Sequence, residues 1–280
     1  MADWIGRQEV RRDRLDDALA IRWLATFDRA GNRDTLPQGI HFCLCTPDAP
    51  TALLGEDGHP ARGEEADTFL PPLPLPRRMW AGSRIEFLRP LAIGQAIERT
   101  SRIADVGEKE GSRGKLGFVT VAHEMLADGE VALREEQTLV YLPPLDPEAP
   151  LSPPPPGDGR FDASGWDASE SLVPDERLLF RYSALTFNTH RIHYDAPYAR
   201  KVERYRGLVV HGPLMASLLL RLAARTVGEN ALRTFAFRAI SPAVAGERLH
   251  LALRQERGAL ELGTFAGDGR QVVRAEATLA

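Results

Sequence analysis

The sequence of 280 residues predicts an α+β fold built from two similar halves, and three observations support this prediction. A twelve-residue segment near the middle of the chain recurs at its end. Segments with alternating apolar and polar residues, typical of half-buried antiparallel strands, precede both copies. A strongly apolar helix in the second half has the composition of a helix covered by a sheet. Helices packed on one side of an antiparallel sheet define the α+β class.

The repeat is clearest between DGEVALREEQTL, residues 128–139, and DGRQVVRAEATL, residues 268–279. The two segments lie 140 residues apart and are identical at six of twelve positions. IEF at 85–87 and FAF at 235–237 are each followed by a proline and, four residues later, a glycine. The separation of these prolines is 152 residues, which indicates a longer loop around 106–115 in the first half. Common order and spacing favour a duplicated unit over two chance strand–turn patterns.

The strands expected in each half belong to antiparallel meanders. Leu116–Met125 alternates and carries β-branched residues, and Arg248–Gln255 places three leucines on one face. Asp128-Gly129 and Asp268-Gly269 are hairpin-turn signals between such strands.

Two helices are expected, one in each half. Asp13–Ala30 has apolar residues near a 3.6-residue period, with Gly31 as a C-cap. Pro213–Thr226 is apolar around most of its circumference and is followed by Gly228. We therefore expect a long buried helix beside a curved sheet, twice.

A proline-rich segment divides the chain. Residues 143–160 contain eight prolines, which form an extended, semi-rigid spacer. The expected organisation is an N-terminal domain over 1–142, this linker over 143–160, and a C-terminal domain over 161–280.

Composition excludes several classes of protein. The net charge of −4 provides no basic field for nucleic acid. The longest apolar run, Leu214–Leu220, is far shorter than a bilayer span, and residues 1–10 lack the pattern of a signal peptide. Two cysteines, Cys43 and Cys45, exclude a disulfide framework or a cysteine-rich zinc site. We expect a protein of the reducing cytoplasm that binds neither membrane nor nucleic acid.

Residues suited to acid–base chemistry gather in one segment, Arg181–Leu220. It contains four of the five tyrosines and three of the seven histidines, and leads into the apolar helix. Asn188, His190, His193 and Asp195 are its densest cluster. A metal site formed by His190, His193 and Asp195 is a weaker alternative, because no regular helical spacing supports it. The prediction is a site without metal.

The start of the apolar helix suggests a binding site for an oxyanion. Gly212 immediately precedes Pro213, and the backbone N–H groups at a helix start are unpaired. They can stabilise a carbonyl oxygen that gains negative charge. The alternative is a simple Gly-Pro helix start.

The segment NTHRIH, residues 188–193, together with VHGPL, residues 210–214, resembles the hydratase motif of the MaoC-like, R-specific enoyl-CoA hydratases. The longer strings at 183–199 and 71–87 are similar to type 2 hydroxyacyl-thioester dehydratases and to mesaconyl-CoA and itaconyl-CoA hydratases. The resemblance implies a double hot dog, two fused units that each wrap a curved antiparallel sheet around a long helix. It further implies a degenerate first half, a catalytic second half, and a hydro-lyase that acts on acyl-CoA without another cofactor.

The chain departs from the motif of that family at decisive positions. The catalytic aspartate corresponds to Asn188, the motif asparagine to His190 and the proline to Arg191, and only His193 is retained. Because an amide is not a useful base, we assign water activation to His193. Asn188 would hold the water, and the Gly212 N–H would bind the thioester oxygen. The expected substrate-binding residues are Ser183, His190, Tyr194, Asp195, His211, Arg77 and Arg78.

The sequence leaves alternatives for the acyl group of the substrate and for the class of reaction. The resemblance favours itaconyl-CoA or mesaconyl-C4-CoA, whose second carboxylate would need a cation. Arg77, Arg78, Lys201, Arg204 and Arg206 are candidates for this role or for the CoA phosphates. Acyl-carrier-protein or other acyl-CoA substrates, a hot-dog thioesterase and a non-catalytic acyl-CoA-binding module remain alternatives. The thioesterase is disfavoured, since Pro213–Leu220 lacks an acidic residue. We expect a homodimer or a higher homo-oligomer.

Overall fold

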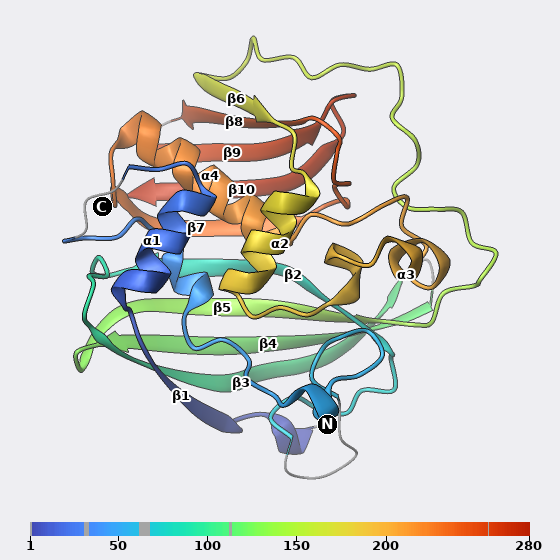
Figure 1. Cartoon of the computed structure of the whole chain (residues 1–280), viewed down its shortest axis with the longest axis horizontal. Helices are drawn as coiled ribbons and strands as arrows, with labels where there is room; N and C mark the ends of the chain where they lie inside the picture. Colours follow the sequence, from blue (N-terminus) through green and yellow to red (C-terminus); the bar gives the residue numbers. More distant parts are fainter. Residues whose placement is uncertain (1, 31–33, 62–67, 112–113, 257) are drawn as a thin grey trace.

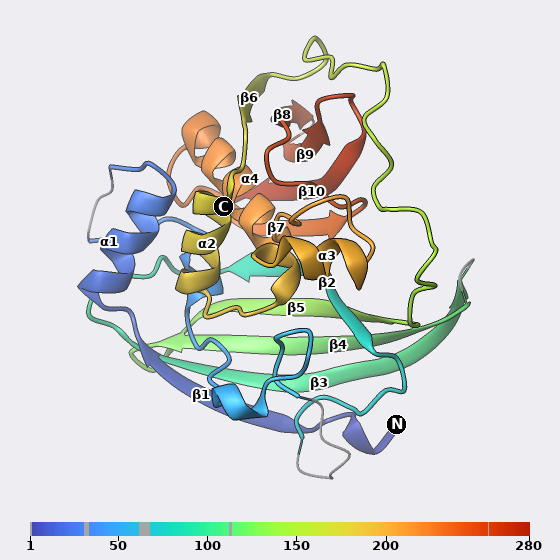
Figure 2. The ribbon, with the colours of Figure 1, turned by 45° about the vertical axis from the view of Figure 1, so that its right-hand side comes forward.

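The chain forms one antiparallel sheet of ten strands with helices on its concave side (Figures 1 and 2). The computed structural model describes residues 2–30, 34–61, 68–111, 114–256 and 258–280. The order of the strands across the sheet is β1-β3-β4-β5-β2-β7-β10-β9-β8-β6. The strands are β1 (Gln8–Arg14), β2 (Arg77–Phe87), β3 (Ala96–Gly111), β4 (Gly114–Ala127), β5 (Glu130–Leu142), β6 (Ala168–Leu172), β7 (Leu232–Ala239), β8 (Leu249–Glu256), β9 (Ala259–Ala266) and β10 (Gln271–Leu279).

The order of the strands has the symmetry that the repeat predicts. Each strand of the first half has a counterpart at the same distance from the central pair, β2 and β7. Ile85 of β2 and Phe235 of β7, which are equivalent by sequence, are direct cross-strand partners. The fold is therefore α+β, a double hot dog, as the sequence predicted.

The turns follow from residues that accept a left-handed backbone. Asp128 and Gly129 have φ values of 50° and 83°, which suits a tight hairpin between β4 and β5. Gly269, with φ of 84°, has the same place between β9 and β10. The expected loop around 106–115 is wrong: residues 106–111 and 114–115 extend the β3–β4 hairpin instead. Cross-strand pairs continue along both strands and use the backbone groups that a loop would leave open.

Among the described residues, the long helix is present in the second half and has no counterpart of similar length in the first. In the first half, α1 (Asp17–Thr26) is shorter than the predicted Asp13–Ala30, because β1 extends to Arg14. Asp16 caps the helix by accepting from the Leu19 N–H at 2.6 Å. Gly31 lies outside the described residues. The N-terminal half thus packs a ten-residue helix and a 3-10 turn, Ile40–Cys43, where a long helix was expected.

The predicted apolar helix is α4 (Gly212–Val227), and it ends at Gly228, whose φ is 109°. Its buried residues pack against β6, β8, β9 and β10. Helix α2 (Glu176–Leu185) lies beside α1 and precedes the short α3 (Ala196–Lys201). Figure 2 shows these helices held in the concavity of the sheet. One apolar core joins the helices to both halves of the sheet.

The proline-rich linker is docked on the protein. The Ser152 N–H donates to the Arg204 carbonyl at 2.7 Å, and the Arg206 N–H donates to the Ser152 carbonyl at 2.9 Å. These bonds attach the linker to the segment after α3. No helix among the described residues is long and apolar enough to span a bilayer. Cys43 and Cys45 are buried free thiols.

Candidate active site

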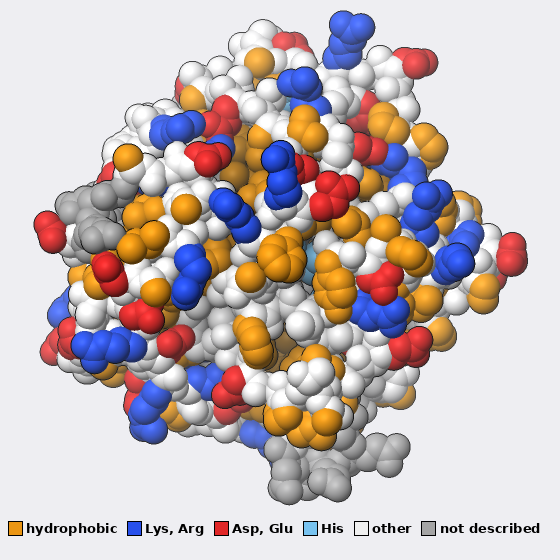
Figure 3. Space-filling view, in the orientation of Figure 1, with side chains coloured by type: hydrophobic (Ala, Val, Ile, Leu, Met, Phe, Trp, Pro, Cys, Tyr) orange, Lys and Arg blue, Asp and Glu red, His pale blue; other side chains and the backbone are white. Residues whose placement is uncertain are grey.

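A cavity of about 660 Å³ lies between the two halves of the sheet and the helices. Its wall includes β2, β4 and β5 of the first half, the segment after α2, and the start of α4. Figure 3 shows hydrophobic side chains around a hollow near the middle of one face, with histidine visible among them. Because both halves contribute to the wall, the site cannot form in the second half alone.

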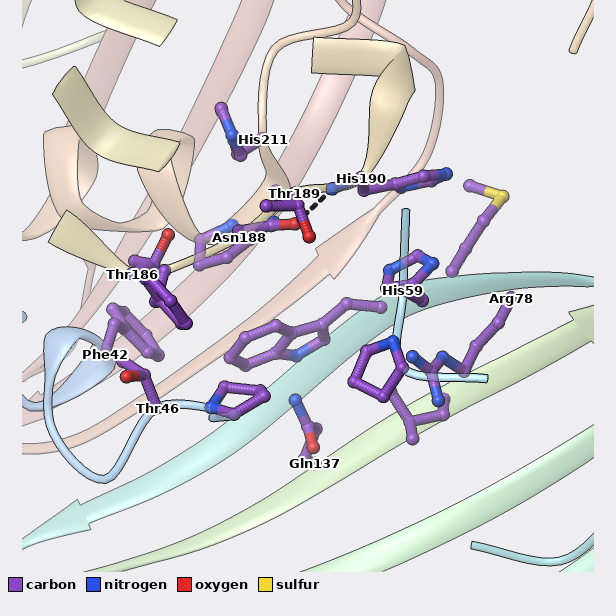
Figure 4. A pocket seen from close by; sticks show the side chains of 18 of the residues that line it. Phe42, Thr46, His59, Arg78, Gln137, Thr186, Asn188, Thr189, His190 and His211 are labelled. Carbon is purple, nitrogen blue, oxygen red and sulfur yellow. Dashed lines mark hydrogen bonds between the residues drawn. The ribbon is translucent and has the colours of Figure 1, made fainter. Parts of the chain in front are cut away.

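The histidine-rich segment forms turns, which direct its side chains into the cavity. The Asn188 N–H donates to the Ser183 carbonyl at 2.9 Å, so the chain reverses at the end of α2. The Asn188 side-chain oxygen then accepts from the His190 N–H at 2.9 Å, the dashed line in Figure 4. A 3-10 turn over Arg191–His193 follows. One lone pair of the Asn188 oxygen is thus used within the turn, and the NH2 group of the amide can donate to a water or a substrate.

His193 is oriented by a single hydrogen bond. Its Nδ1 lies 2.7 Å from the Val209 carbonyl oxygen, which can only accept, so Nδ1 carries the proton. Nε2 therefore has a free electron pair. Burial lowers the pKa of His193 to about 4, although the bond to Val209 acts in the opposite direction. At neutral pH the ring is uncharged and able to accept a proton.

His211 lies directly against His193. The ring centroids are 3.6 Å apart with planes inclined by 19°, and the Ser183 hydroxyl lies 2.9 Å from His211 Nε2. Burial and the neighbouring His193 lower the pKa of His211. Ser183 does not line the cavity and acts on it only through His211.

Gly212 has the position expected for an oxyanion donor. It is the first residue of α4, lines the cavity, and follows His211. An added Cβ on Gly212 would lie 3.8 Å from the Trp80 carbonyl oxygen, so β2 passes close to the helix start. The Gly212 N–H, which has no partner within the helix because it belongs to the first turn, lies at the cavity wall.

Four of the predicted substrate-binding residues lie outside the cavity wall: Ser183, Tyr194, Asp195 and Arg77. Asp195 is the N-cap of α3 and pairs with Arg191 at 2.7 Å, because this segment is helical and not an alternating strand. Tyr194 is 51% exposed. Arg77 pairs with Glu203 at 2.7 Å.

Two of the other basic residues are also used within the protein. Arg206 pairs with Glu247, and Arg204 donates to the Ala149 carbonyl. Lys201, at the end of α3, is exposed. The cavity wall thus retains Asn188, His190, His193, His211, Gly212 and Arg78 of the predicted residues.

A loop of the first half adds two residues that sequence reasoning missed. Asp57 and His59 lie on the turn closed by a single antiparallel bridge between Leu54 and Pro60, and His59 lines the cavity. Asp57 Oδ2 lies 3.0 Å from His59 Nδ1. The His59 ring lies over the His190 ring with centroids 4.1 Å apart, as Figure 4 shows. In the sequence, this pair is only a carboxylate and a histidine on either side of Gly58. Its relation to the site follows from the fold, which brings the loop to His190.

Arg78 is the cation of this part of the cavity. This residue of β2 lines the cavity and lies near His59 (Figure 4). The positive charge of Arg78 contributes to lowering the pKa values of His190 and Asp57. Within the described ranges, no carboxylate pairs with Arg78. It is therefore available to an anionic group of a ligand.

The part of the cavity wall formed by β4 and β5 of the first half contains polar side chains. The Ser83 hydroxyl donates to the buried Glu135 carboxyl at 2.5 Å and accepts from the Trp80 N–H at 2.9 Å. Burial raises the pKa of Glu135 to about 7, against the effects of Ser83 and Arg99. His123 is also buried there, and burial lowers its pKa to about 3.

The donor atoms of Asp57, His59 and His190 lie within 4.8 Å of one another, close enough to surround an ion. Two features oppose this role. Arg78 adds a positive charge beside them. Asp57 is already bonded to His59 Nδ1, which leaves two imidazoles where a zinc site needs at least three protein ligands. We therefore treat Asp57 and His59 as a hydrogen-bonded pair and not as metal ligands.

Comparison with known proteins identifies relatives over almost the whole chain. The family model described as hydroxyacyl-thioester dehydratase type 2 matches residues 39–245. A mesaconyl-C4-CoA hydratase of Chloroflexus aurantiacus is 41% identical, over 99% of this chain and 96% of its own. A mitochondrial hydroxyacyl-thioester dehydratase type 2 of Schizosaccharomyces pombe is 28% identical, over 84% of this chain and 82% of its own. A MaoC-like dehydratase of Phytophthora capsici has the same fold, with a TM-score of 0.72, 12% identity and coverage of 100% and 99%.

Proposed function

The chain belongs to the hydroxyacyl-thioester dehydratase type 2 family, and from this premise we propose which reaction its cavity catalyses. The protein is a hydro-lyase of the enoyl-CoA hydratase and dehydratase class. It adds water across the α,β double bond of an enoyl-CoA and removes water in the reverse direction. The observation that carries this function is the placement of His193, Asn188 and Gly212 on one cavity wall.

The proposed substrate is a branched C5 dicarboxylic acyl-CoA, mesaconyl-C4-CoA, with citramalyl-CoA as product. Itaconyl-CoA is the second candidate; its double bond lies between the β and γ carbons, so the same product requires protonation of its methylene carbon. The name of the relative from Chloroflexus aurantiacus supports it. Arg78 supports it independently, because the cavity offers an unpaired guanidinium beside the histidines. In mesaconyl-C4-CoA the free carboxylate is attached to the carbon that water attacks, so its cation must lie close to the reacting atoms. Arginine can bind a carboxylate through two parallel hydrogen bonds.

The proposed mechanism uses the neutral form of His193. Nε2 of His193 takes a proton from water while the water oxygen forms a bond to the β carbon. The Asn188 amide donates to that water and fixes its position. Negative charge develops on the thioester oxygen and is stabilised by the Gly212 N–H at the start of α4. A proton added to the α carbon completes the reaction, and dehydration follows the same steps in reverse.

A panel of enoyl-CoA esters tests this function. Purified protein is mixed with mesaconyl-C4-CoA, itaconyl-CoA, crotonyl-CoA and a longer chain, and loss of the conjugated absorbance is followed. We expect the highest kcat/KM with a C5 dicarboxylic ester. Preference for a long apolar chain would instead favour the general dehydratase alternative.

A parallel measurement with a thiol reagent tests thioester hydrolysis. Helix α4 contains no aspartate or glutamate over its whole length, so we expect no release of free CoA. Release of CoA without loss of the double bond would indicate a thioesterase. Tight binding of these esters with neither reaction would indicate a binding module.

A further inference from the structure

The hydration reaction needs one group that removes a proton from water and another that delivers a proton to the α carbon. Asn188 carries an amide, which does not titrate, so His193 is the candidate base of this segment. The other two histidines of this segment are poor proton donors. Burial lowers the pKa values of His190 and His211, so both rings are uncharged at neutral pH. A proton donor distinct from His193 has to lie elsewhere in the cavity wall.

We propose that His59, oriented by Asp57, is the catalytic acid that protonates the α carbon, so that the first half of the chain supplies one of the two catalytic groups. This inference rests on the proposed hydratase function and adds a residue to it. Asp57 acts through His59 and is a positioning residue.

The geometry of the pair suits a proton donor. Asp57 Oδ2 accepts from His59 Nδ1 at 3.0 Å, which fixes the orientation of the ring and places a negative charge beside it. Burial alone would raise the pKa of Asp57, but its hydrogen bond and charge interaction with His59 outweigh this and hold the pKa below its usual value. Among the histidines at this end of the cavity, His59 is the one beside a carboxylate.

The loop that carries the pair is fixed to the histidine segment. The Arg191 N–H donates to the Asp57 carbonyl at 2.9 Å, and the Thr189 hydroxyl donates to the Gly58 carbonyl at 2.5 Å. Gly58 has a φ of 86°, and a Cβ there would lie 1.9 Å from the Thr189 carbonyl oxygen. Glycine is therefore required for this contact. The loop places His59 against His190 without a gap, and the position of the ring depends on both halves.

The environments of the two histidines divide the roles between them. His193 is buried, bonded to a carbonyl and uncharged, which suits a base. His59 is bonded to a carboxylate, which suits an acid. Among the described residues, Arg78, His190 and His193 are titratable or charged groups near His59. Neighbouring groups whose surroundings favour opposite protonation states are the usual sign of an acid and base pair.

The proton balance of the step is complete. The oxygen of water bonds to the β carbon, and the proton released from it goes to Nε2 of His193. The electron pair of the double bond moves toward the thioester oxygen and then returns to the α carbon. The α carbon takes its proton from the imidazolium of His59, which becomes neutral. Between turnovers His193 loses its proton to solvent and His59 regains one.

His59→Gln and Asp57→Asn in the full-length protein test the assignment. With mesaconyl-C4-CoA, we expect His59→Gln to lower kcat about 100-fold or more, and to remove the alkaline limb of the pH profile of kcat. Asp57→Asn should lower kcat by about tenfold and move the alkaline limb to lower pH. Asp57→Glu, which keeps a carboxylate, should restore part of kcat and part of the shift in the limb. Exchange of the α proton of the product with deuterium oxide should slow in parallel with His59→Gln. A merely structural loop would not change the limb or the exchange.

His250→Gln is the matched control, because His250 stacks on Phe161 at the other end of the molecule and does not line the cavity. Its kcat and pH profile should equal those of the wild type. Thermal unfolding checks that each variant is folded. Near-normal kcat and an unchanged pH profile in folded His59→Gln would overturn the inference and leave the hydratase function intact. Absence of hydratase activity in the wild type would overturn both the inference and the proposed function. A stoichiometric metal ion that is bound by the wild type and lost in His59→Gln would assign Asp57 and His59 to a metal site instead.

Discussion

His193 and His211 stack face to face, with ring centroids 3.6 Å apart, and both are buried in the wall of the cavity. A positive charge on either ring would be repelled by a charge on the other and would lack water to stabilise it. Burial, with a smaller contribution from His59, keeps His193 in the uncharged form that can accept a proton. The hydroxyl of Ser183 contacts His211, and the carbonyl of Val209 accepts from His193.

Replacement of the proposed base should abolish most of the activity. His193→Ala removes the group that takes the proton from water, so we expect kcat to fall by about 100-fold or more. Single-turnover absorbance measurements with mesaconyl-C4-CoA test this. Near-normal turnover in a folded variant would contradict the assignment.

The pH profile of the wild type should carry the signature of His193. Its pKa of about 4 means that the neutral, active form predominates above that pH and is lost as the pH falls through it. We therefore expect kcat/KM to stay constant on the acidic side down to about pH 5. A decline centred near pH 6.5 would show that the ring is not buried in solution.

Asn188→Asp should reduce activity, although it introduces the carboxylate that the motif resemblance implies at this position. A carboxylate can still accept from the His190 N–H, but it can no longer donate a hydrogen bond to water. We expect kcat to fall by about fivefold, corresponding to one hydrogen bond of about 1 kcal/mol. Steady-state kinetics over a range of pH provide the measurement, and a higher kcat would show that the amide has no role of its own.

Arg78 should determine preference for a dicarboxylic acyl group. Arg78→Gln removes a charge-assisted hydrogen bond of about 1.5–3 kcal/mol, so kcat/KM for mesaconyl-C4-CoA should fall by about 10- to 100-fold. Activity with crotonyl-CoA, which lacks the second carboxylate, should change little. Arg84→Gln, an exposed position on the same strand, is the control. Equal losses with both substrates would assign Arg78 to CoA or to the fold.

Glu135 should make the protein less stable as the pH rises. Its pKa is raised from 4.5 to about 7 in the folded state, so the folded protein binds more protons than the unfolded chain between these values. The free energy of unfolding therefore loses about 3 kcal/mol from this group as the pH rises through that window. Glu135→Gln should remove the loss and keep the bond from Ser83. Urea unfolding of both proteins at pH 5 and pH 8 measures the difference, and equal pH dependence would contradict it.

The regular parts of the fold could be predicted because each rests on local physics. Alternation marked β4 and β8, the Asp-Gly pairs marked the β4–β5 and β9–β10 hairpins, and apolar residues around most of the circumference marked α4. The first-half helix was predicted too long, since the apolar period of α1 continues into a strand and a turn. The extension of β3 and β4 was missed because a long hairpin with polar residues has the composition of a loop.

The sequence by itself determined the duplicated α+β unit, the apolar helix and the segment that carries Asn188, His193 and Gly212. Tertiary structure decided which other side chains reach that segment. Pairing of β2 with β7 closes the two halves into one sheet and places Arg78 at the cavity. The contact at Gly58 then brings Asp57 and His59 to His190, more than a hundred residues away along the chain. Such contacts depend on the closure of the whole sheet, and no pattern along the chain encodes them.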